Sequence, residues 1–458
     1  MNSCSFTLFT FAAVIFLQCL SSIEAARCHP DDEAGLLAFK AGITQDPSGI
    51  LISSWKKGTF CCAWHGIACG ESGRVVTLDI AGEAVYDKKY LPSTISPSLA
   101  KVQHLESIYI FQRKLTGSFP QFLFKLPNLR VVYLIYTGLS GPLPANIGAL
   151  SQLVALNLVG NHFTGPIPSS ISNMTRLTEL KLGGNRLSGT IPSIFKSMKS
   201  LETLDLSRNR LSGKLPTYLA TTLKDLILSE NNLSGMIPND LSKLKALNNL
   251  DLSKNRFSGV VPMSFAKLTE LTSLHLSHNL LTDPFPALNN TIGGIASLDL
   301  SYNKFHLKKI PEWVISSTFK SALKLAKCGI KMSFDDLKPV QLNDYGYIDL
   351  SDNDISGSPA SFLNQTDDLL LEFRASGNKL RFDMGKLEFN KALKVLVLSR
   401  NLIFGEVPKT VVGLKKLNLS QNHLFGKLPA TKFPASAFVG NDCLCGSPLP
   451  PCKAGTVD

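Results

Sequence analysis

The sequence has 458 residues, of which 44% are hydrophobic and 18% are charged, and this composition excludes a disordered or polyelectrolyte chain. Lysine and arginine outnumber the acids by 47 to 35, which gives a net charge of +12. No single block of like charge carries the excess, which argues against a basic tail that binds nucleic acid. After residue 25 no uncharged apolar run reaches 18 residues, so we expect no membrane insertion.

Residues 1–25 have the pattern of a secretory signal peptide. An apolar stretch runs from Phe6 to Leu20, and the small residues that follow predict cleavage after Ala25. A membrane anchor is the alternative, but the stretch is too short to span a bilayer. At the other end, Lys453–Asp458 is polar and offers no signal for a lipid anchor. We therefore expect a secreted protein.

Cysteine usage agrees with an oxidising, extracellular location. Loss of the signal leaves eight cysteines, which are Cys28, Cys61, Cys62, Cys69, Cys328, Cys443, Cys445 and Cys452. Their clustering at both ends of the chain indicates disulfide-bonded caps, and the scarcity of histidine around them argues against a zinc site. We expect no metal ion and no cofactor.

A short helix is predicted at the start of the mature chain. Asp31–Glu33 precede Leu36, Leu37 and Phe39, which is the pattern of an amphipathic helix whose first turn is capped by acidic residues. We expect this helix to belong to a cover for the hydrophobic edge of the repeats that follow.

From residue 75 to residue 429 the sequence repeats on the template L-x-x-L-x-L-x-x-N-x-L. The Asn of the template falls at Asn161, Asn185, Asn209, Asn231, Asn255, Asn279, Asn303, Asn353, Asn378, Asn401 and Asn422. Cys328 fills the middle of a 50-residue interval, and Thr137, Arg113 and Glu83 occupy the position in weaker units at the start. The pattern predicts fifteen units.

One unit is too small to bury its own leucines, so neighbouring units must stack. The L-x-L segment alternates inward and outward side chains as a strand does, and stacked units pair these strands in parallel about 4.8 Å apart. The Asn faces inward at the next turn, where it can satisfy backbone groups that the bend leaves unpaired. An L-x-G-x-[IVLF]-P segment follows, in which Gly permits a positive φ and Pro prevents a helix. Interruptions at Asp283 and Pro359 predict that units ten to thirteen are irregular.

Three motifs resemble those of plant extracellular leucine-rich-repeat proteins, in particular polygalacturonase-inhibiting proteins. They are W-x(5)-C-C-x-W-x-G-x-x-C at Trp55–Cys69, the plant-specific L-x-G-x-I-P repeat, and C-L-C-G-x-P-L-P-x-C at Cys443–Cys452. The resemblance covers essentially the whole mature chain. It implies an α/β leucine-rich-repeat solenoid, a curved right-handed superhelix with a parallel concave sheet, an irregular or 3-10 convex side and disulfide caps at both ends.

These patterns divide the chain into a signal peptide (1–25), an N-terminal cap (26–74), the repeats (75–429) and a C-terminal cap (430–458). The resemblance implies the disulfides Cys28–Cys61, Cys62–Cys69 and Cys445–Cys452. The family's remaining bridge joins the first cysteine of the C-terminal cap to one in the last repeat, but Phe425 stands in that place here. Cys328 is about 20 Å from Cys443 by strand spacing, which is beyond disulfide reach. We therefore predict two free thiols, Cys328 buried and Cys443 accessible.

The residue between the paired leucines points outward and forms a column along the concave face, where solenoids usually bind. Large apolar side chains gather on the second and third units, at Tyr109, Phe111, Tyr133, Ile135 and Tyr136. Exposed aromatic residues at this density predict a hot spot for a protein partner. The alternative is packing against the insertion 86–97, folded over the same rim.

Farther along, the column alternates in charge, and the further candidate contact residues are Lys181, Asp205, Asp251, His275 and Asp299. Alternation avoids repulsion between adjacent carboxylates and favours attraction between Asp and Lys or His, so charge balance within the ladder is the alternative to a binding role. His275 lies between Asp251 and Asp299, which favours its charged form, and we expect partner binding to change at mildly acidic pH.

No pattern of catalytic residues stands out. Carboxylates two rungs apart would be about 10 Å apart, as in an inverting glycosidase, but an open sheet neither excludes water nor raises the pKa of one acid. His275 and His278 have no convergent third ligand for a metal. The sequence has no phosphate loop, H-E-x-x-H motif or nucleophile elbow, so we do not expect an enzyme.

Five N-glycosylation sequons occur, at Asn173, Asn232, Asn289, Asn364 and Asn418. Asn418 lies on the concave column, where a glycan would block the last units and direct a partner towards the aromatic end. The alternative is that this site is skipped because its strand folds first.

These patterns and the resemblance predict a secreted, non-enzymatic recognition protein of the plant apoplast and cell wall. The resemblance implies a microbial polygalacturonase as the partner, held on the concave face and inhibited in defence. A second hypothesis is a ligand-binding or co-receptor role, with a peptide ligand or a membrane-bound receptor kinase as partner. A third is direct binding of acidic pectin through the basic surplus.

Overall fold

The computed structural model describes residues 27–43, 49–81, 93–288, 291, 294–315, 321–337, 345–365, 369–389 and 391–452. The expected signal peptide, Glu83, most of the insertion 86–97, Asn289 and Lys453–Asp458 lie outside these residues. The chain divides into two compact units, the first ending at Leu187 and the second beginning at Ser188.

The first unit begins with a helical cap that disulfides hold together. Its elements are α2 (Pro30–Ala41), α3 (Ile50–Ser54), η1 (Cys61–Ala63) and β1 (Ile67–Cys69). The disulfides join Cys28 to Cys61 and Cys62 to Cys69, which is the pairing that the resemblance implies. Strand β1 runs antiparallel to β2 (Val75–Ala81), so the cap continues directly into the sheet of the repeats.

The acidic residues of α2 do not cap the helix as the sequence suggested. His29 is the N-cap, and its side chain accepts a hydrogen bond from the Asp31 amide. Asp32 is fully buried, pairs with Arg74 at 2.8 Å and accepts a hydrogen bond from the Val75 amide. Because a buried carboxylate is stable only with such partners, Asp32 fixes the helix to the start of β2.

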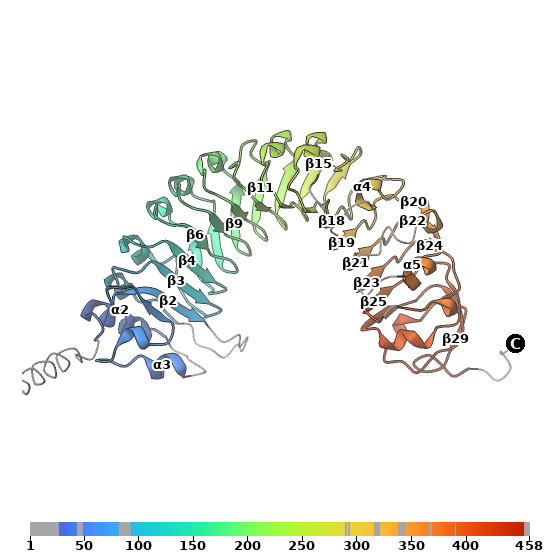
Figure 1. Ribbon diagram of the computed structural model, residues 1–458, viewed down its shortest axis with the longest axis horizontal. Coiled ribbons are helices and arrows are strands. Elements are labelled where there is room, and N and C mark those ends of the chain that lie inside the picture. Colours follow the sequence, from blue (N-terminus) through green and yellow to red (C-terminus); the bar gives the residue numbers. More distant parts are fainter. Residues whose placement is uncertain are drawn as a thin grey trace, which may run out of the picture. The chain divides into compact units, whose positions relative to one another are not determined.

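Each unit has an inner sheet of parallel strands, one from each repeat, in chain order. In the first unit β2 is followed by β3 (Ser107–Phe111), β4 (Val131–Ile135), β6 (Ala155–Asn157) and β8 (Glu179–Lys181). In the second unit the strands are β10 (Thr203–Asp205), β12 (Asp225–Ile227), β14 (Asn249–Asp251), β16 (Ser273–His275), β18 (Ser297–Asp299), β19 (Ala322–Lys324), β21 (Tyr347–Asp349), β23 (Glu372–Arg374), β25 (Val395–Val397) and β27 (Lys416–Asn418). Figure 1 shows these strands along the concave side of each unit.

A second row of short strands follows the Asn positions. In the first unit it contains β5 (Ser140–Pro142), β7 (His162–Gly165) and the start of β9 (Arg186–Thr190). In the second unit it contains β11 (Arg210–Gly213), β13 (Asn232–Gly235), β15 (Arg256–Val260) and β17 (Leu280–Thr282), then β20 (Lys331–Ser333), β22 (Asp354–Gly357) and β24 (Lys379–Leu380), and then β26 (Phe404–Gly405), β28 (His423–Lys427) and β29 (Cys443–Cys445).

Short 3-10 helices lie on the outer side of the repeats, opposite the inner sheets (Figure 1). In the first unit they are η2 (Pro97–Lys101), η3 (Gln121–Lys125), η4 (Ile147–Ala149) and η5 (Ser169–Asn173). In the second unit they are η6 (Ser193–Ser197), η7 (Asn239–Lys243), η8 (Met263–Lys267), η9 (Phe334–Asp336), η11 (Met384–Lys386), η12 (Lys409–Gly413) and η13 (Ala435–Ala437). Most regular repeats therefore carry a 3-10 helix on this side, as the family resemblance implies.

The stretch predicted to be irregular differs from the regular repeats in its helices. After Asn303 and Asn353 the outer side carries short α-helices, α4 (Glu312–Ile315) and α5 (Ala360–Gln365), in place of 3-10 helices. The strands β20, β22 and β24 of this stretch form a small sheet of their own. The interruption of the Gly-x-x-Pro bend at Asp283 and Pro359 marks this change in the sequence.

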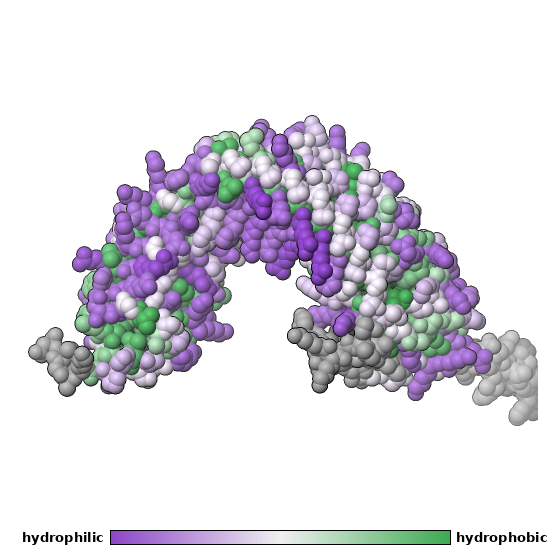
Figure 2. Space-filling view, turned by 180° about the vertical axis from the view of Figure 1, so that it is seen from behind, coloured by the Kyte–Doolittle hydropathy of each residue, from purple (hydrophilic) through white to green (hydrophobic). Residues whose placement is uncertain are grey.

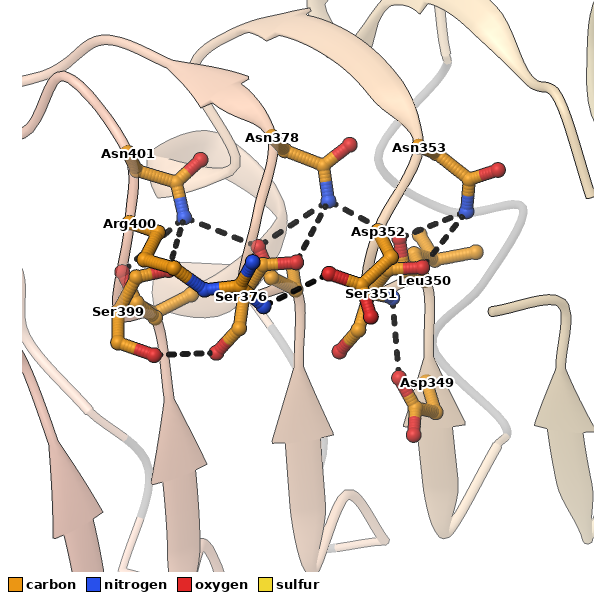
Figure 3. A network of polar contacts seen from close by, with 12 residues as sticks. Asp349, Leu350, Ser351, Asp352, Asn353, Ser376, Asn378, Ser399, Arg400 and Asn401 are labelled. Carbon is orange, nitrogen blue, oxygen red and sulfur yellow. Dashed lines mark hydrogen bonds and ion pairs between the residues drawn. The ribbon is translucent and has the colours of Figure 1, made fainter. Parts of the chain in front are cut away.

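The Asn side chains that recur at the turn of each repeat form a ladder of buried hydrogen bonds. At Asn279, Nδ2 donates to the carbonyls of Leu252 and Leu276, both at 3.0 Å, and Oδ1 accepts from the Phe257 amide at 2.9 Å. Figure 3 shows the donating half of this pattern at three later positions, Asn353, Asn378 and Asn401. Each side chain thus ties its own turn to the preceding repeat, which confirms the inward orientation predicted from the spacing.

Cys328 interrupts this ladder. Its Sγ lies 3.5 Å from the Leu300 carbonyl oxygen and 3.7 Å from that of Ala326, and a thiol is only a weak donor. The side chain is fully buried, and burial raises the pKa of the thiol. The position therefore keeps the inward orientation but loses most of the hydrogen bonding.

The ladder continues one step beyond the last Asn that the sequence template finds. Asn441 Nδ2 donates to the carbonyls of Leu419 and Phe438, and its Oδ1 accepts from the Leu424 amide at 3.1 Å. The template misses this residue because Ser436 stands where the template requires Leu, and η13 replaces the strand there.

A small cap closes the second unit. Its disulfide joins Cys445 to Cys452, and β29 pairs with β28 so that Cys443 lies opposite Phe425. Among the described residues, the free cysteines are Cys328, which is buried, and Cys443, which is exposed. The structure therefore confirms the predicted pairing and both predicted free thiols.

Candidate binding surface

The outward side chains of β3 and β4 form the densest group of candidate contact residues in the first unit. Each strand alternates buried and half-exposed positions, as a sheet with one solvated face does. The register places Tyr109 opposite Tyr133 and Phe111 opposite Ile135. The structure thus brings these side chains together on the inner face, as the sequence predicts.

The rings of this group contact one another. The Tyr109 and Tyr133 centroids lie 5.3 Å apart in an edge-to-face arrangement, and Phe111 lies 6.3 Å from Tyr109 and 6.5 Å from Tyr133. Such geometries stabilise aromatic pairs beyond simple burial. We call Tyr109, Phe111, Tyr133, Ile135 and Tyr136 the aromatic cluster.

Tyr136 stands at the margin of the aromatic cluster. It has a left-handed backbone with φ of 52°, and 55% of its surface is exposed. A Cβ atom at Gly160 would collide with the Tyr136 ring, so the ring lies directly over the next turn. The insertion that could instead cover the cluster falls mostly at residues outside the described chain, and its role stays a hypothesis.

Glu179, a carboxylate that was not among the residues predicted from the sequence, lies beside the aromatic cluster. Glu179 of β8 pairs through Oε2 with Lys181 Nζ at 2.8 Å. Burial, followed by the nearby Glu179 carboxylate, raises the pKa of Tyr133 to about 12. Small Ala155 occupies the rung between Val131 and Glu179. Glu179 points outward two residues before Lys181 of the column. Its closeness to Tyr133 depends on the register between strands, which the sequence pattern alone does not give.

The charged column in the second unit has the predicted register. In the register of the parallel strands, Asp251 lies beside His275, and His275 lies beside Asp299. The aspartates also have a structural role. Asp251 Oδ1 accepts hydrogen bonds from the amide and the hydroxyl of Ser253 at 2.9 and 2.6 Å, and Asp299 Oδ1 accepts from the Ser301 amide at 3.1 Å.

The same turn contact recurs at Asp205 and Asp349, whose carboxylates accept from the amides of Ser207 and Ser351. Figure 3 shows the contact at Asp349. An Asp side chain that accepts from the amide two residues later stabilises a turn. This contact explains why the sequence L-D-L-S recurs in the repeats, and it supports a structural role for these acids alongside any binding role.

The cations of the column form their direct ion pairs within a strand. Arg374 pairs with Glu372 at 3.0 Å, as Lys181 pairs with Glu179. His275 Nε2 lies 2.8 Å from the Ser297 hydroxyl, and none of the ion pairs found in the described part of the chain joins it to Asp251 or Asp299. The expected attraction between neighbouring rungs is therefore not expressed as direct salt bridges, and a pH response through His275 remains a prediction.

The sequons differ in exposure. Asn173, Asn232 and Asn364 are exposed, whereas Asn418 is half-buried on β27. The Asn418 Oδ1 atom accepts hydrogen bonds from the Ser420 amide and hydroxyl at 3.0 and 2.8 Å. These contacts leave the amide nitrogen, to which a glycan would be joined, unaddressed, so glycosylation of Asn418 stays a prediction.

Polar residues predominate over the surface drawn in Figure 2, with hydrophobic residues in small groups. No group of three or more potential metal ligands occurs among the described residues. None of the helices in the described chain is both long and apolar enough to cross a bilayer.

Comparison with known protein families agrees with the inner sheets and the Asn ladder. The model of the leucine-rich-repeat N-terminal domain matches residues 29–70, and leucine-rich-repeat models match residues 152–174, 175–219 and 221–281. The chain carries leucine-rich repeats behind a leucine-rich-repeat N-terminal domain. The repeats beyond residue 281 are assigned by their strands and by the continued ladder.

Curated relatives match this leucine-rich-repeat chain over part of its length. Polygalacturonase inhibitor 2 of Phaseolus vulgaris is 44% identical over 113 residues, which is 23% of this chain and 33% of the inhibitor. The DNA damage-repair/toleration protein DRT100 of Arabidopsis thaliana is 33% identical over 118 residues, which is 24% of this chain and 31% of that protein. The chain therefore spans about a third of the length of these relatives.

Solved structures of leucine-rich-repeat proteins share the fold over a larger part of the chain. The plant peptide hormone receptor RGFR1, in complex with RGF2, superposes with a TM-score of 0.55 and 25% identity, covering 77% of this chain and 65% of the receptor chain.

Proposed function

We propose that this chain is an extracellular plant recognition protein that binds a protein partner on the inner sheet of its first unit. The aromatic cluster carries this proposal. Its rings are packed against one another, half-exposed on rigid paired strands, and therefore contribute contact area at little entropic cost when a partner binds.

The proposed partner is a microbial polygalacturonase, which the chain would inhibit in the apoplast and cell wall during defence. Support comes from three bean polygalacturonase inhibitors that are 42% to 44% identical to this chain over 113 residues. The matched segment is a third of each inhibitor, so the partner has to be tested directly.

Inhibition of a panel of microbial polygalacturonases by the purified protein tests this function. If the aromatic cluster forms the hot spot, Tyr109→Ala and Tyr133→Ala should each weaken inhibition by about 30-fold. Tyr218→Ala is the control, since Tyr218 is a 49% exposed tyrosine that lies outside the inner sheets. Lack of inhibition across the panel would contradict the inhibitor function, and equal loss in all three variants would contradict the role of the aromatic cluster.

A peptide ligand or a receptor kinase is the second candidate partner. The structural similarity to a peptide hormone receptor in complex with its peptide favours it. In a pull-down from plant cell-wall extract, this role predicts capture of a peptide or a receptor ectodomain that depends on Tyr109 and Tyr133. Capture of a polygalacturonase with loss of its activity would instead support the inhibitor function.

Acidic pectin is a third candidate, favoured by the net charge of +12. Elution from immobilised pectin distinguishes it, because binding through exposed charges weakens steeply as salt screens them. Retention that is unaffected by salt, or no retention at all, would exclude this charge-driven role.

A further inference from the structure

Two tyrosine rings elsewhere in the described chain, those of Tyr347 and Tyr218, have cations over them. In the inner sheet of the second unit, Lys324 Nζ lies 5.0 Å from the centroid of the Tyr347 ring, and Arg374 Cζ lies 5.8 Å from it. Tyr218 likewise has Lys196 Nζ 4.8 Å from its ring centroid. These distances allow the attraction between a cation and the negative face of an aromatic ring.

Within the residues that the structure describes, no such cation lies over the aromatic rings of the cluster. Over the described part of the chain, no lysine or arginine forms a cation–π contact with Tyr109, Phe111 or Tyr133. Their ring contacts are with one another, and two of the three are edge-to-face. As far as the described chain goes, the cluster therefore offers negative ring faces that no positive charge matches.

Glu179 adds an unmatched acceptor beside these rings. Its Oε2 receives Lys181, whereas its Oε1 is buried and no hydrogen-bond donor to it is found among the described residues. A carboxylate can accept about four hydrogen bonds, so one lysine leaves most of this capacity unused. The side chain is 21% exposed, and rotation of its terminal bond can present Oε1 to an approaching donor.

A carboxylate of this chain already binds two cations at once. Glu230 Oε1 lies 3.0 Å from Lys254 Nζ and 3.5 Å from Arg208 Nε. Lys181 therefore does not prevent Glu179 from accepting a second cation. With a second cation bound, Glu179 would have two cationic partners, as Glu230 has.

We infer that the aromatic cluster and Glu179 together form a receptor site for a basic side chain of the partner, an arginine or a lysine. This inference deepens the proposed function and rests on it, because it assumes that a protein partner binds this face. The cation would lie against the Tyr109 and Tyr133 rings while its N–H groups donate to Glu179. Arginine suits the site best, because its planar guanidinium can stack on a ring and bond a carboxylate at the same time.

Small probes test the site without the partner. N-acetyl-arginine methylamide and its neutral isostere N-acetyl-citrulline methylamide can be titrated against the intact protein by saturation-transfer NMR. Because the isostere keeps the shape and most donors but lacks the charge, we expect the arginine probe to bind about tenfold more tightly. Equal affinity for the two probes would overturn the inference, and this comparison needs no variant.

Two substitutions locate the effect. Glu179→Gln should reduce the preference for arginine to about twofold or less, and Tyr133→Leu should weaken arginine binding several-fold. The matched control is Glu372→Gln, because Glu372 has the same position before Arg374 and the same within-strand ion pair at 3.0 Å. An arginine preference that survives Glu179→Gln, or one lost equally with Glu372→Gln, would contradict the proposed site.

The result is independent of the polygalacturonase assay. Arginine binding at Glu179 without inhibition of any polygalacturonase would reject the inhibitor function and retain the cation site. Inhibition without any arginine preference would retain the function and reject the site.

Discussion

At the residue scale, Cys328 offers a direct test of the ladder. Its thiol makes only long contacts to the carbonyls of Leu300 and Ala326, whereas Asn303 donates to Leu276 at 3.0 Å and Leu300 at 2.9 Å. Replacing a weak donor by an amide at a buried turn should restore hydrogen bonding worth about 1 kcal/mol. We therefore predict that Cys328→Asn raises the midpoint of denaturant unfolding.

The reverse substitution is the control for this prediction. Asn303→Cys should lower the unfolding midpoint, because it leaves buried carbonyl groups without a strong donor. A neutral Cys328→Asn together with a neutral Asn303→Cys would show that the ladder contributes little to stability.

The two free thiols should also react differently. Cys443 is exposed, whereas Cys328 is buried and has a raised thiol pKa, which lowers the fraction of reactive thiolate. Iodoacetamide treatment of the native protein should therefore modify Cys443 alone, and both cysteines should react after unfolding. Peptide mass mapping checks this, and an unreactive Cys443 in the native protein would mean that another group covers or bonds it.

Single residues were predictable from sequence where one position alone determines the contact. The Asn positions are of this kind, whereas the disulfide partners were implied by the resemblance to a known family. Glu179 was not, because its proximity to Tyr133 depends on the lateral register and on the small Ala155 between the strands. Asp32 was misjudged for a similar reason, since its partner Arg74 is distant in sequence.

At the scale of elements, the close stacking of short helices should tolerate no added atom. A Cβ atom at Gly148 in η4 would collide with the carbonyl oxygen of Ser170 in η5, although the backbone of Gly148 is not left-handed. We predict that Gly148→Ala destabilises the protein by about 1–3 kcal/mol, the usual cost of overpacking, and calorimetry can measure it.

The control for this prediction is Gly413→Ala in η12. Nothing lies within 4 Å of a Cβ atom placed at Gly413, and its φ is also not left-handed. This variant should unfold at the wild-type temperature, so equal effects of the two substitutions would contradict the packing explanation.

Elements were predictable where the repeat is strict. The L-x-L segments became the strands of the inner sheets because alternation and stacking both require it. The last turn at Asn441 was missed because η13 stands where a strand was expected. The α-helices α4 and α5 were anticipated only as irregularity, because an interrupted bend indicates a change without specifying its form.

At the scale of the whole molecule, the units depend on neighbours and on their caps. The N-terminal cap holds the first strands through two disulfides and the buried Asp32–Arg74 pair, and Cys445–Cys452 closes the other end. Function at this scale was only partly predictable. The sequence identifies an exposed aromatic group, but the packing of the repeats does not depend on which partner binds and so does not identify it.

The most direct test of the central claim is hydroxyl-radical footprinting of the protein with and without a saturating polygalacturonase that it inhibits. Our account predicts that Tyr109, Phe111, Tyr133 and Tyr136 are oxidised in the free protein and protected in the complex, while Tyr218 is oxidised equally in both. Protection of these residues in the free protein, or protection of Tyr218 without protection of the aromatic cluster, would contradict it.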